Sequence, residues 1–252
     1  MDIFMSAYNP EWPAQFEAVK DELAGDLEDE GVSFLSIEHV GSTSVPNLPA
    51  KAVIDIMIVI PATDFDPLHL AGFKEALSWG KRQGGYHYIG DGGVKGRWSF
   101  KLWEREPIRH VYVVADGSLP LRSCRALRDT LRRHEGLRSE YGALKIQLAM
   151  RQYDNIMQYS TLKNPVIRKI LREAGWTEEE IDEKESQSVT DWPRPDRVLP
   201  KRTCWDKVQA CFFAVARAPS RCYGILSQCF KKKIQGENCE PHHKTNSIPL
   251  EW

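Results

Sequence analysis

Residues 38–60 read EHVGSTSVPNLPAKAVIDIMIVI, and this stretch decides the fold. The segment from Val53 to Ile60 is apolar and rich in β-branched residues, which predicts a buried central strand. A shorter strand is predicted before it, from Phe34 to His39. The link from Gly41 to Lys51 holds Gly, Ser, Thr, Asn and two prolines, so we expect a loop without regular structure. The stretch therefore predicts a strand, a loop and a second strand that carries one carboxylate, Asp55.

Further helices and strands are predicted around this unit. Trp12, Phe16, Val19, Leu23 and Leu27 recur every three or four residues, which predicts an amphipathic helix opened by Pro10 and closed by Gly31. We also expect a helix over 64–79, a glycine-closed hairpin over 86–103, a strand over 109–115 and helices from 121 to 175. The fold class is therefore α+β, a mixed β-sheet flanked by helices, with a helical C-terminal part.

Length and composition exclude several classes of protein. The chain has 252 residues, 42% hydrophobic and 27% charged, which excludes disorder of the whole chain. No stretch approaches the roughly 18 apolar residues of a membrane-spanning helix, and residues 1–10 lack the form of a signal peptide. We therefore expect a cytoplasmic protein. The formal net charge of −1 divides into +4 for residues 185–252 and −5 for residues 1–184, so we expect no extensive nucleic-acid binding by the main body.

Composition changes near residue 182, which predicts a folded domain over 1–182 and a linker with a basic tail over 183–252. Residues 185–252 hold eleven Lys and Arg against seven Asp and Glu. The tail is expected to be poorly ordered or helical, and three other interpretations stay open: a disulfide-stapled helical hairpin, a membrane-surface segment and a metal site. Five of the six cysteines lie there: Cys204, Cys211, Cys222, Cys229 and Cys239.

Gly41 and Ser42 directly follow the first predicted strand, and Asp55 lies in the next one. A glycine permits close backbone approach, N–H groups and a hydroxyl donate to phosphate oxygens, and a nearby carboxylate can hold Mg²⁺. Position 57 shares the strand face of Asp55 and would carry the second carboxylate of a two-metal site, but it is Met57. The pattern predicts a phosphate site with an incomplete metal motif.

The stretch from Glu38 to Ile56 resembles the signature of the GrpB-like family in the nucleotidyltransferase superfamily. Similar segments occur elsewhere, and the resemblance covers roughly residues 6–176. They are Tyr8-Asn-Pro-Glu-Trp, Gly96-Arg-Trp-Ser-Phe, His110-Val-Tyr-Val, Arg128-Asp, Tyr141-Gly-Ala-Leu-Lys and Ile170-Leu-Arg-Glu-Ala-Gly-Trp. Asn47 stands where the family commonly has Gly, a mild departure because Asn tolerates the left-handed region.

The resemblance implies a nucleotidyltransferase fold that binds a nucleotide or another phosphorylated small molecule with Mg²⁺. Asp55 would be the catalytic metal carboxylate, with Glu38 as a further metal ligand. The expected substrate-binding residues are Gly41, Ser42, Thr43, Ser44, Lys51, Arg97, His110 and Lys145.

Each of these assignments has a structural alternative. Gly41-Ser42 could be an ordinary turn, and Asp55 a buried acid neutralised by an arginine such as Arg97, which would show as a direct bond. Three functions follow: a Mg²⁺-dependent nucleotidyltransferase, a binding module that turns nothing over, and an interaction scaffold with a membrane-surface tail. A second acid near Asp55 would favour the enzyme, and an apolar environment around Met57 the binding module.

Overall fold

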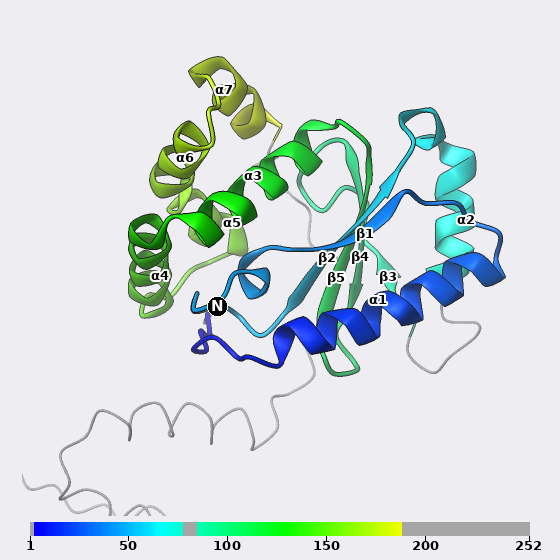
Figure 1. The fold of residues 1–252 in the computed structure, drawn as a ribbon, viewed down its shortest axis with the longest axis horizontal. Coiled ribbons are helices and arrows are strands. Elements are labelled where there is room, and N and C mark those ends of the chain that lie inside the picture. The colour runs from blue at the N-terminus through cyan, green and yellow to red at the C-terminus, as the bar shows by residue number, and fades with distance from the viewer. Residues whose placement is uncertain (1–2, 78–84, 188–252) are drawn as a thin grey trace, which may run out of the picture. The chain divides into compact units, whose positions relative to one another are not determined.

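The computed structural model describes residues 3–77 and 85–187, and these form an α+β fold (Figure 1). The strands are β1 Ser36–Val40, β2 Ile54–Ile60, β3 His87–Tyr88, β4 Arg97–Leu102 and β5 Arg109–Ala115. The α-helices are α1 Trp12–Asp29, α2 Pro67–Leu77, α3 Leu119–Arg133, α4 Glu135–Ala149, α5 Ile156–Thr161, α6 Asn164–Glu173 and α7 Glu178–Ser186. The predicted fold class, a mixed sheet with flanking helices and a helical C-terminal part, is confirmed.

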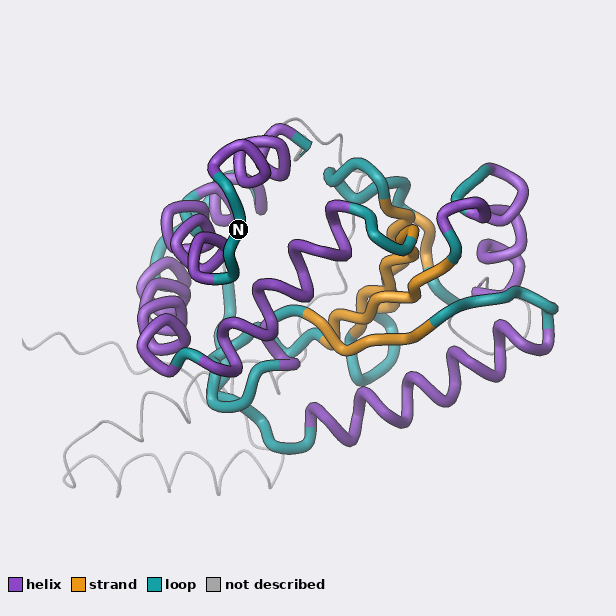
Figure 2. The backbone as a smooth tube through the Cα atoms, turned by 45° about the horizontal axis from the view of Figure 1, so that its top comes forward, coloured by secondary structure: helices purple, strands orange, loops and turns teal. Residues whose placement is uncertain are grey.

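The strands form one sheet in the order β1-β2-β5-β4-β3 (Figure 2). Only the β2–β5 pair is parallel within this sheet, and the other neighbours are antiparallel. The expected central strand is therefore paired on both sides, with Asp55 opposite Val40 on β1 and His110 on β5. This register places the polar residues of β2 and β5 next to the end of β1, where the Gly41 loop begins.

Helix α1 covers one face of the sheet and follows the predicted pattern. Its buried residues are the five that the sequence singles out: Trp12, Phe16, Val19, Leu23 and Leu27. They pack in one cluster with Ile54, Ile56, Ile58 and Ile60 of β2. The helix begins at Trp12 with Pro13 in its first turn, so Pro10 lies ahead of it, and Gly31 follows its end with a positive φ of 67°.

Helix α3 lies on the opposite side of the sheet from α1 (Figure 1). Met57 and Val59 of β2 pack there with Val40, Val114 and Leu121 in a smaller apolar cluster. Because side chains two residues apart on a strand share a face, Asp55 faces the same side as Met57. The carboxylate therefore lies at the edge of an apolar cluster, on the face that α3 and the later helices cover.

Several predicted boundaries are corrected by the structure. Residues 42–44 form a 3₁₀ turn, although no regular structure was expected in the loop, and α2 begins at Pro67 where a helix from Asp64 was predicted. Helix α5 lies within the 121–175 segment predicted to be helical, whereas α7 lies beyond it. Helix α7 spans residue 182, and the domain division expected there stays a prediction. The tail over 188–252, with its cysteines and its expected membrane-surface contact, lies outside the described residues, so those interpretations stay predictions.

Among residues 3–77 and 85–187, no helix combines the length and the apolar character needed to span a bilayer.

The buried face of α1 gives a stability prediction. Leu27 is 0% exposed, and replacing it with Ala should lower the free energy of unfolding by about 2–5 kcal/mol through lost burial and a cavity. Urea denaturation measures this change. Glu28→Ala, at an exposed position of the same turn, should stay within about 0.5 kcal/mol of the wild type. Equal losses in the two variants would contradict the assigned helix face.

Candidate phosphate-binding site

The backbone of Gly41 passes directly against the carboxylate of Asp55. Gly41 has a φ of 70°, a conformation that side chains disfavour. A Cβ added there would lie 2.4 Å from Asp55 Oδ2, which no real side chain tolerates. Gly41 is therefore required twice, for its backbone conformation and for the close approach of the loop to the acid.

The turn that follows Gly41 is held by hydrogen bonds from both ends. The Ser44 hydroxyl donates to the Gly41 carbonyl at 2.6 Å, and the Thr43 hydroxyl donates to the Val53 carbonyl at 3.1 Å. Arg132 of α3 donates from Nε and Nη2 to the Ser44 carbonyl at 3.0 and 2.8 Å. Thr43 and Ser44 are buried, so the turn is a fixed part of the site.

Asp55 is surrounded by groups that stabilise its ionised form. Tyr112 donates its hydroxyl proton to Asp55 Oδ1 at 3.3 Å, and His110 Nδ1 lies 3.5 Å from the same oxygen. Burial would raise the pKa of Asp55, but His110, the charge of Lys51 and the Tyr112 hydroxyl together hold it below its usual value. Oδ2 has no hydrogen-bond donor among the described residues. One carboxylate oxygen thus stays available to a cation.

The arginine-bonded alternative for Asp55 is not what the structure shows. Arg97 donates from Nε to the Asp91 carbonyl at 2.8 Å and from Nη2 to the Gly92 carbonyl at 3.1 Å. Its guanidinium lies 4.3 Å from the centre of the Tyr112 ring. Arg97 therefore stands beside the acid and shapes the glycine turn, without forming an ion pair with Asp55.

Asp55 lies in a pocket of about 390 Å³ whose charged lining is almost entirely basic. The pocket also contains Ser42 and Thr43 of the turn, and Asp55 is the one acidic residue among its lining residues. The basic residues that line it are Lys51, Arg97, Lys101, Lys145, Lys163 and Lys184. Six cationic side chains around one carboxylate create a strongly anion-attracting cavity.

Crowding and burial lower the pKa values of the pocket lysines. Lys145 is 2% exposed and donates to the Pro49 carbonyl, and burial with the charges of Lys163 and Lys51 lowers its pKa to about 7. Burial, together with the charge of Lys51, lowers the pKa of Lys163 to about 8. A bound anion would reverse these effects, because it supplies the negative charge that the cluster lacks.

Another part of the pocket wall is less polar. Ile156, Met157 and Tyr159 come from α5 and Ile167 from α6, with hydroxyl and amide groups beside them at Ser160, Thr161 and Asn164. Lys163 and Lys51 stand over the Tyr159 ring at 4.6 and 5.5 Å. The pocket therefore offers both a cationic wall and an apolar wall with hydrogen-bonding groups.

Most of the predicted substrate-binding residues come together here. Gly41 backs onto the acid and Ser44 faces a neighbouring pocket. Sequence reasoning missed the basic lining residues Lys101, Lys163 and Lys184, because a single lysine carries no periodic signal that it faces a cavity. The predicted residues that line this pocket are Ser42, Thr43, Lys51, Asp55, Arg97, His110 and Lys145.

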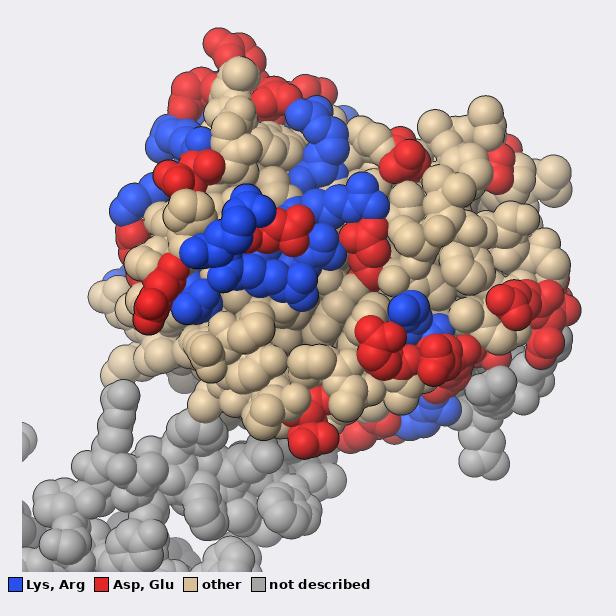
Figure 3. Space-filling view, viewed as in Figure 1, with Lys and Arg blue, Asp and Glu red and all other residues tan. Residues whose placement is uncertain are grey.

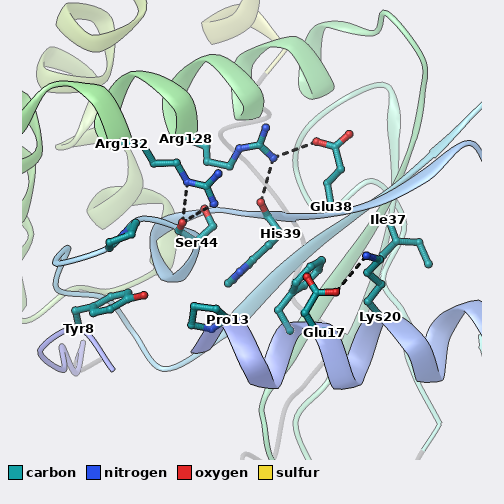
Figure 4. A pocket seen from close by; sticks show the side chains of 12 residues that line it. Tyr8, Pro13, Glu17, Lys20, Ile37, Glu38, His39, Ser44, Arg128 and Arg132 are labelled. Carbon is teal, nitrogen blue, oxygen red and sulfur yellow. Dashed lines mark hydrogen bonds and ion pairs between the residues drawn. The ribbon is translucent and has the colours of Figure 1, made fainter. Parts of the chain in front are cut away.

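Glu38, an expected metal ligand, is not among the residues that line this pocket. Its carboxylate is bonded by Arg125 and Arg128 of α3, with Nη1 of Arg128 at 3.0 Å (Figure 4). Burial would raise its pKa, but the two arginines lower it to about 2. Two guanidinium partners compete with any metal for this carboxylate, so the geometry argues against Glu38 as a ligand.

A second metal carboxylate is likewise missing from the surroundings of Asp55. Met57 is 0% exposed inside the apolar cluster, and the β5 residues beside β2 at this level are His110 and Tyr112. Among the described residues, no three His, Cys, Asp or Glu side chains form a group suited to a metal. The site can therefore supply one carboxylate to a cation, and the remaining ligands must come from water and substrate.

Comparison with known proteins identifies the family to which this sequence belongs. Residues 2–173 match the family described as GrpB protein. The chain belongs to the GrpB family. It is 31% identical to protein YqkA of Bacillus subtilis (strain 168) over 161 residues, covering 64% of this chain and 44% of YqkA. The GrpB chain thus spans less than half the length of that relative.

Two solved structures are similar to this GrpB chain to different degrees. The conserved protein GrpB from Enterococcus faecalis is 32% identical and covers 68% of this chain and 96% of its own, with a TM-score of 0.55. The Cid1 poly(U) polymerase is 13% identical, covering 54% of this chain and 43% of its own, with a TM-score of 0.33. The second likeness is too weak to support any assignment of residues or activity.

The contact between Gly41 and Asp55 yields a test with an internal control. Gly41→Ala should lower the free energy of unfolding by about 1–3 kcal/mol through backbone strain. Displacement of the Asp55 carboxylate by the new Cβ should lower it further. Gly25→Ala in α1 has nothing within 4 Å of its new Cβ and should instead stabilise by about 0.5–1 kcal/mol. Chemical denaturation of both variants measures the difference. Unchanged stability in Gly41→Ala would show that the close approach is absent in solution.

Proposed function

We propose that this GrpB protein binds a nucleoside triphosphate, or another polyphosphorylated small molecule, in the pocket around Asp55. The observation that carries the proposal is the lining of six basic side chains around a single carboxylate. Such a charge excess is costly to maintain in a partly buried cavity unless a polyanion compensates it. The depressed pKa values of Lys145 and Lys163 are the expression of that cost.

The arrangement of the walls supports a nucleotide within this class. Phosphates would lie against the lysines and the hydroxyls of Ser42 and Thr43. A base or another flat group would lie against Ile156 and Met157, where neighbouring hydroxyl and amide groups offer hydrogen bonds. A volume of about 390 Å³ is at the lower end of typical small-molecule pockets, so part of a nucleotide would extend toward solvent.

Mg²⁺ fits the site as a companion of the phosphates. Asp55 is ionised and its Oδ2 has no donor, so this oxygen would be the protein ligand, with water and phosphate oxygens completing the shell. When bound, the ion would neutralise phosphate charge. The basic side chains would neutralise phosphate charge elsewhere in the pocket. A site that has Met57 in place of a second metal-binding carboxylate could therefore still hold a polyphosphate.

Nucleotidyl transfer is the second candidate, and the ionised Asp55 beside the Ser42–Ser44 turn favours it. This chain would contribute by positioning the phosphates and by neutralising charge that develops on the leaving pyrophosphate through Lys51, Lys145 and Lys163. In this transfer an acceptor hydroxyl would attack the α-phosphorus while the bond to pyrophosphate breaks, so release of pyrophosphate from ATP with Mg²⁺ and a panel of hydroxyl acceptors would identify turnover. Binding without pyrophosphate release would identify the binding module.

Substitution of the carboxylate separates metal binding from phosphate binding. In the wild type, millimolar ATP should raise the thermal unfolding temperature, and Mg²⁺ should raise it further. Asp55→Asn should lose the Mg²⁺ increment and keep the metal-free shift, because the lysines remain and the one repelling carboxylate is neutralised. Absence of any ATP shift in a folded wild-type protein would overturn the proposed function, whereas a full Mg²⁺ increment in Asp55→Asn would overturn only the metal assignment.

The lysines give the binding a defined pH dependence. Above about pH 7.5 the phosphates of ATP are fully ionised, so further changes in affinity belong to the protein. Lys145 and Lys163, with pKa values of about 7 and 8, lose protons as pH rises, and a bound polyanion favours their protonated forms. Affinity for metal-free ATP should therefore fall between pH 7.5 and 9.5, by at most about tenfold per pH unit for each proton taken up.

Calorimetry at pH 8 in buffers of different ionisation enthalpy measures this proton uptake directly. Lys145→Met should reduce both the uptake and the affinity, the latter by about tenfold. Lys169→Met is the matched control, since Lys169 is 56% exposed, pairs with Glu140 and lies outside the pocket lining. Binding of ATP with no proton uptake at pH 8 would contradict the role given to the two lysines.

A further inference from the structure

A second pocket, of about 420 Å³, lies beside the Ser42–Ser44 turn, with Ser44 in its lining (Figure 4). Ser44 lines this pocket, whereas Ser42 and Thr43 line the pocket around Asp55, which we call the phosphate pocket after its proposed ligand. The two cavities share no lining residue. The turn thus contributes to the lining of both cavities. We call the second cavity the His39 pocket, after the buried histidine in its lining.

Arg132 is the unmatched cation of the His39 pocket. Its Nε and Nη2 both donate to the Ser44 carbonyl, and it forms no ion pair with a carboxylate among the described residues. Arg128, beside it on α3, is committed to Glu38 and Asp129. Figure 3 shows Lys and Arg side chains gathered on this face with acidic side chains between them. Arg132 therefore retains positive charge and donor capacity for an anion.

The charge balance of the two pockets is very different. The His39 pocket is lined by three cations, Lys20, Arg128 and Arg132, and two acids, Glu17 and Glu38, which leaves one positive charge. The phosphate pocket has six cations and one acid. A single excess charge matches a monoanion, and the guanidinium fork matches the two oxygens of a carboxylate.

The uncharged part of the lining includes four apolar side chains beside Tyr8, His39 and Ser44. Phe16 and Ile37 are each about nine-tenths buried, and Pro13 and Pro46 complete this surface. The Phe16 ring stacks on His39 with centroids 4.7 Å apart. Burial lowers the pKa of His39 to about 4, so the imidazole adds no charge near neutral pH. An apolar or aromatic group can therefore contact these side chains without removing water from a charged imidazole.

We propose that the His39 pocket binds a small monocarboxylate with an apolar or aromatic body, held by Arg132 at its carboxylate and by the Phe16 surface at its body. This site is independent of the proposed phosphate site and takes a different chemical class of ligand. Its carboxylate would lie next to Arg132, the residue that also fixes the Ser44 carbonyl, so the ligand and the turn share one guanidinium.

Histidine NMR distinguishes the two sites in the intact chain, with benzoate as the probe. His39 lines one pocket and His110 the other, so ring signals assigned through His39→Gln and His110→Asn variants report on each. Benzoate should shift the His39 signals saturably and leave His110 unchanged. Benzamide, the neutral analogue, should shift neither. No saturable His39 shift, or an equal shift with benzamide, would overturn the proposal, as would benzoate acting only on His110.

Two further measurements test the charge match. Arg132→Lys keeps the charge and removes the fork, and should weaken benzoate about tenfold. Arg133→Lys, exposed on the same helix and outside the pocket lining, should leave benzoate affinity unchanged. Phenyl phosphate, a dianion, should bind at His39 more weakly than benzoate. Tighter binding of phenyl phosphate there would overturn the carboxylate assignment and identify a second phosphate site.

Discussion

The approach of the Gly41 backbone to the Asp55 carboxylate is the constraint on which the rest of the site depends. It exists because β1 pairs with β2 in a register that ends opposite Asp55, and because the chain leaves β1 with a positive φ. Any Cβ at position 41 would collide with the acid. The close approach then fixes where the Ser42–Ser44 turn lies, and that turn forms a wall of both pockets.

The packing of α3 explains why the acid stands alone. Met57 shares the face of Asp55 and is enclosed by Val40, Val114 and Leu121 beneath α3. A carboxylate at position 57 would be buried among apolar groups at a cost of several kcal/mol, unless a cation or metal accompanied it. The same strand face therefore cannot hold both the apolar cluster and the second carboxylate of a two-metal site. Here the cluster occupies position 57, and the lysines supply the positive charge.

Sequence reasoning was most successful where the signal was local. The five buried residues of α1, the apolar strand around Asp55 and the glycine before the turn all follow from periodicity and conformational preference. The partner of Glu38 could not be deduced in that way, since 87 residues separate it from Arg125. Lys163, which precedes α6, and Lys184 on α7 were missed for a related reason, because a lysine looks like a solvated surface residue until the fold brings it to a cavity.

The distribution of charge over the chain favours a small ligand in the phosphate pocket. Residues 1–184 carry a formal net charge of −5, although the pocket lining holds six cations and one acid. The remainder of this segment must therefore carry an excess of acidic residues over basic ones. A long polyanion such as a nucleic acid would meet repulsion over most of the surface, and salt screens attraction beyond about 8 Å. A compact polyphosphate that enters the cavity meets six cations and one carboxylate, so this distribution of charge favours a small polyanion over a long one.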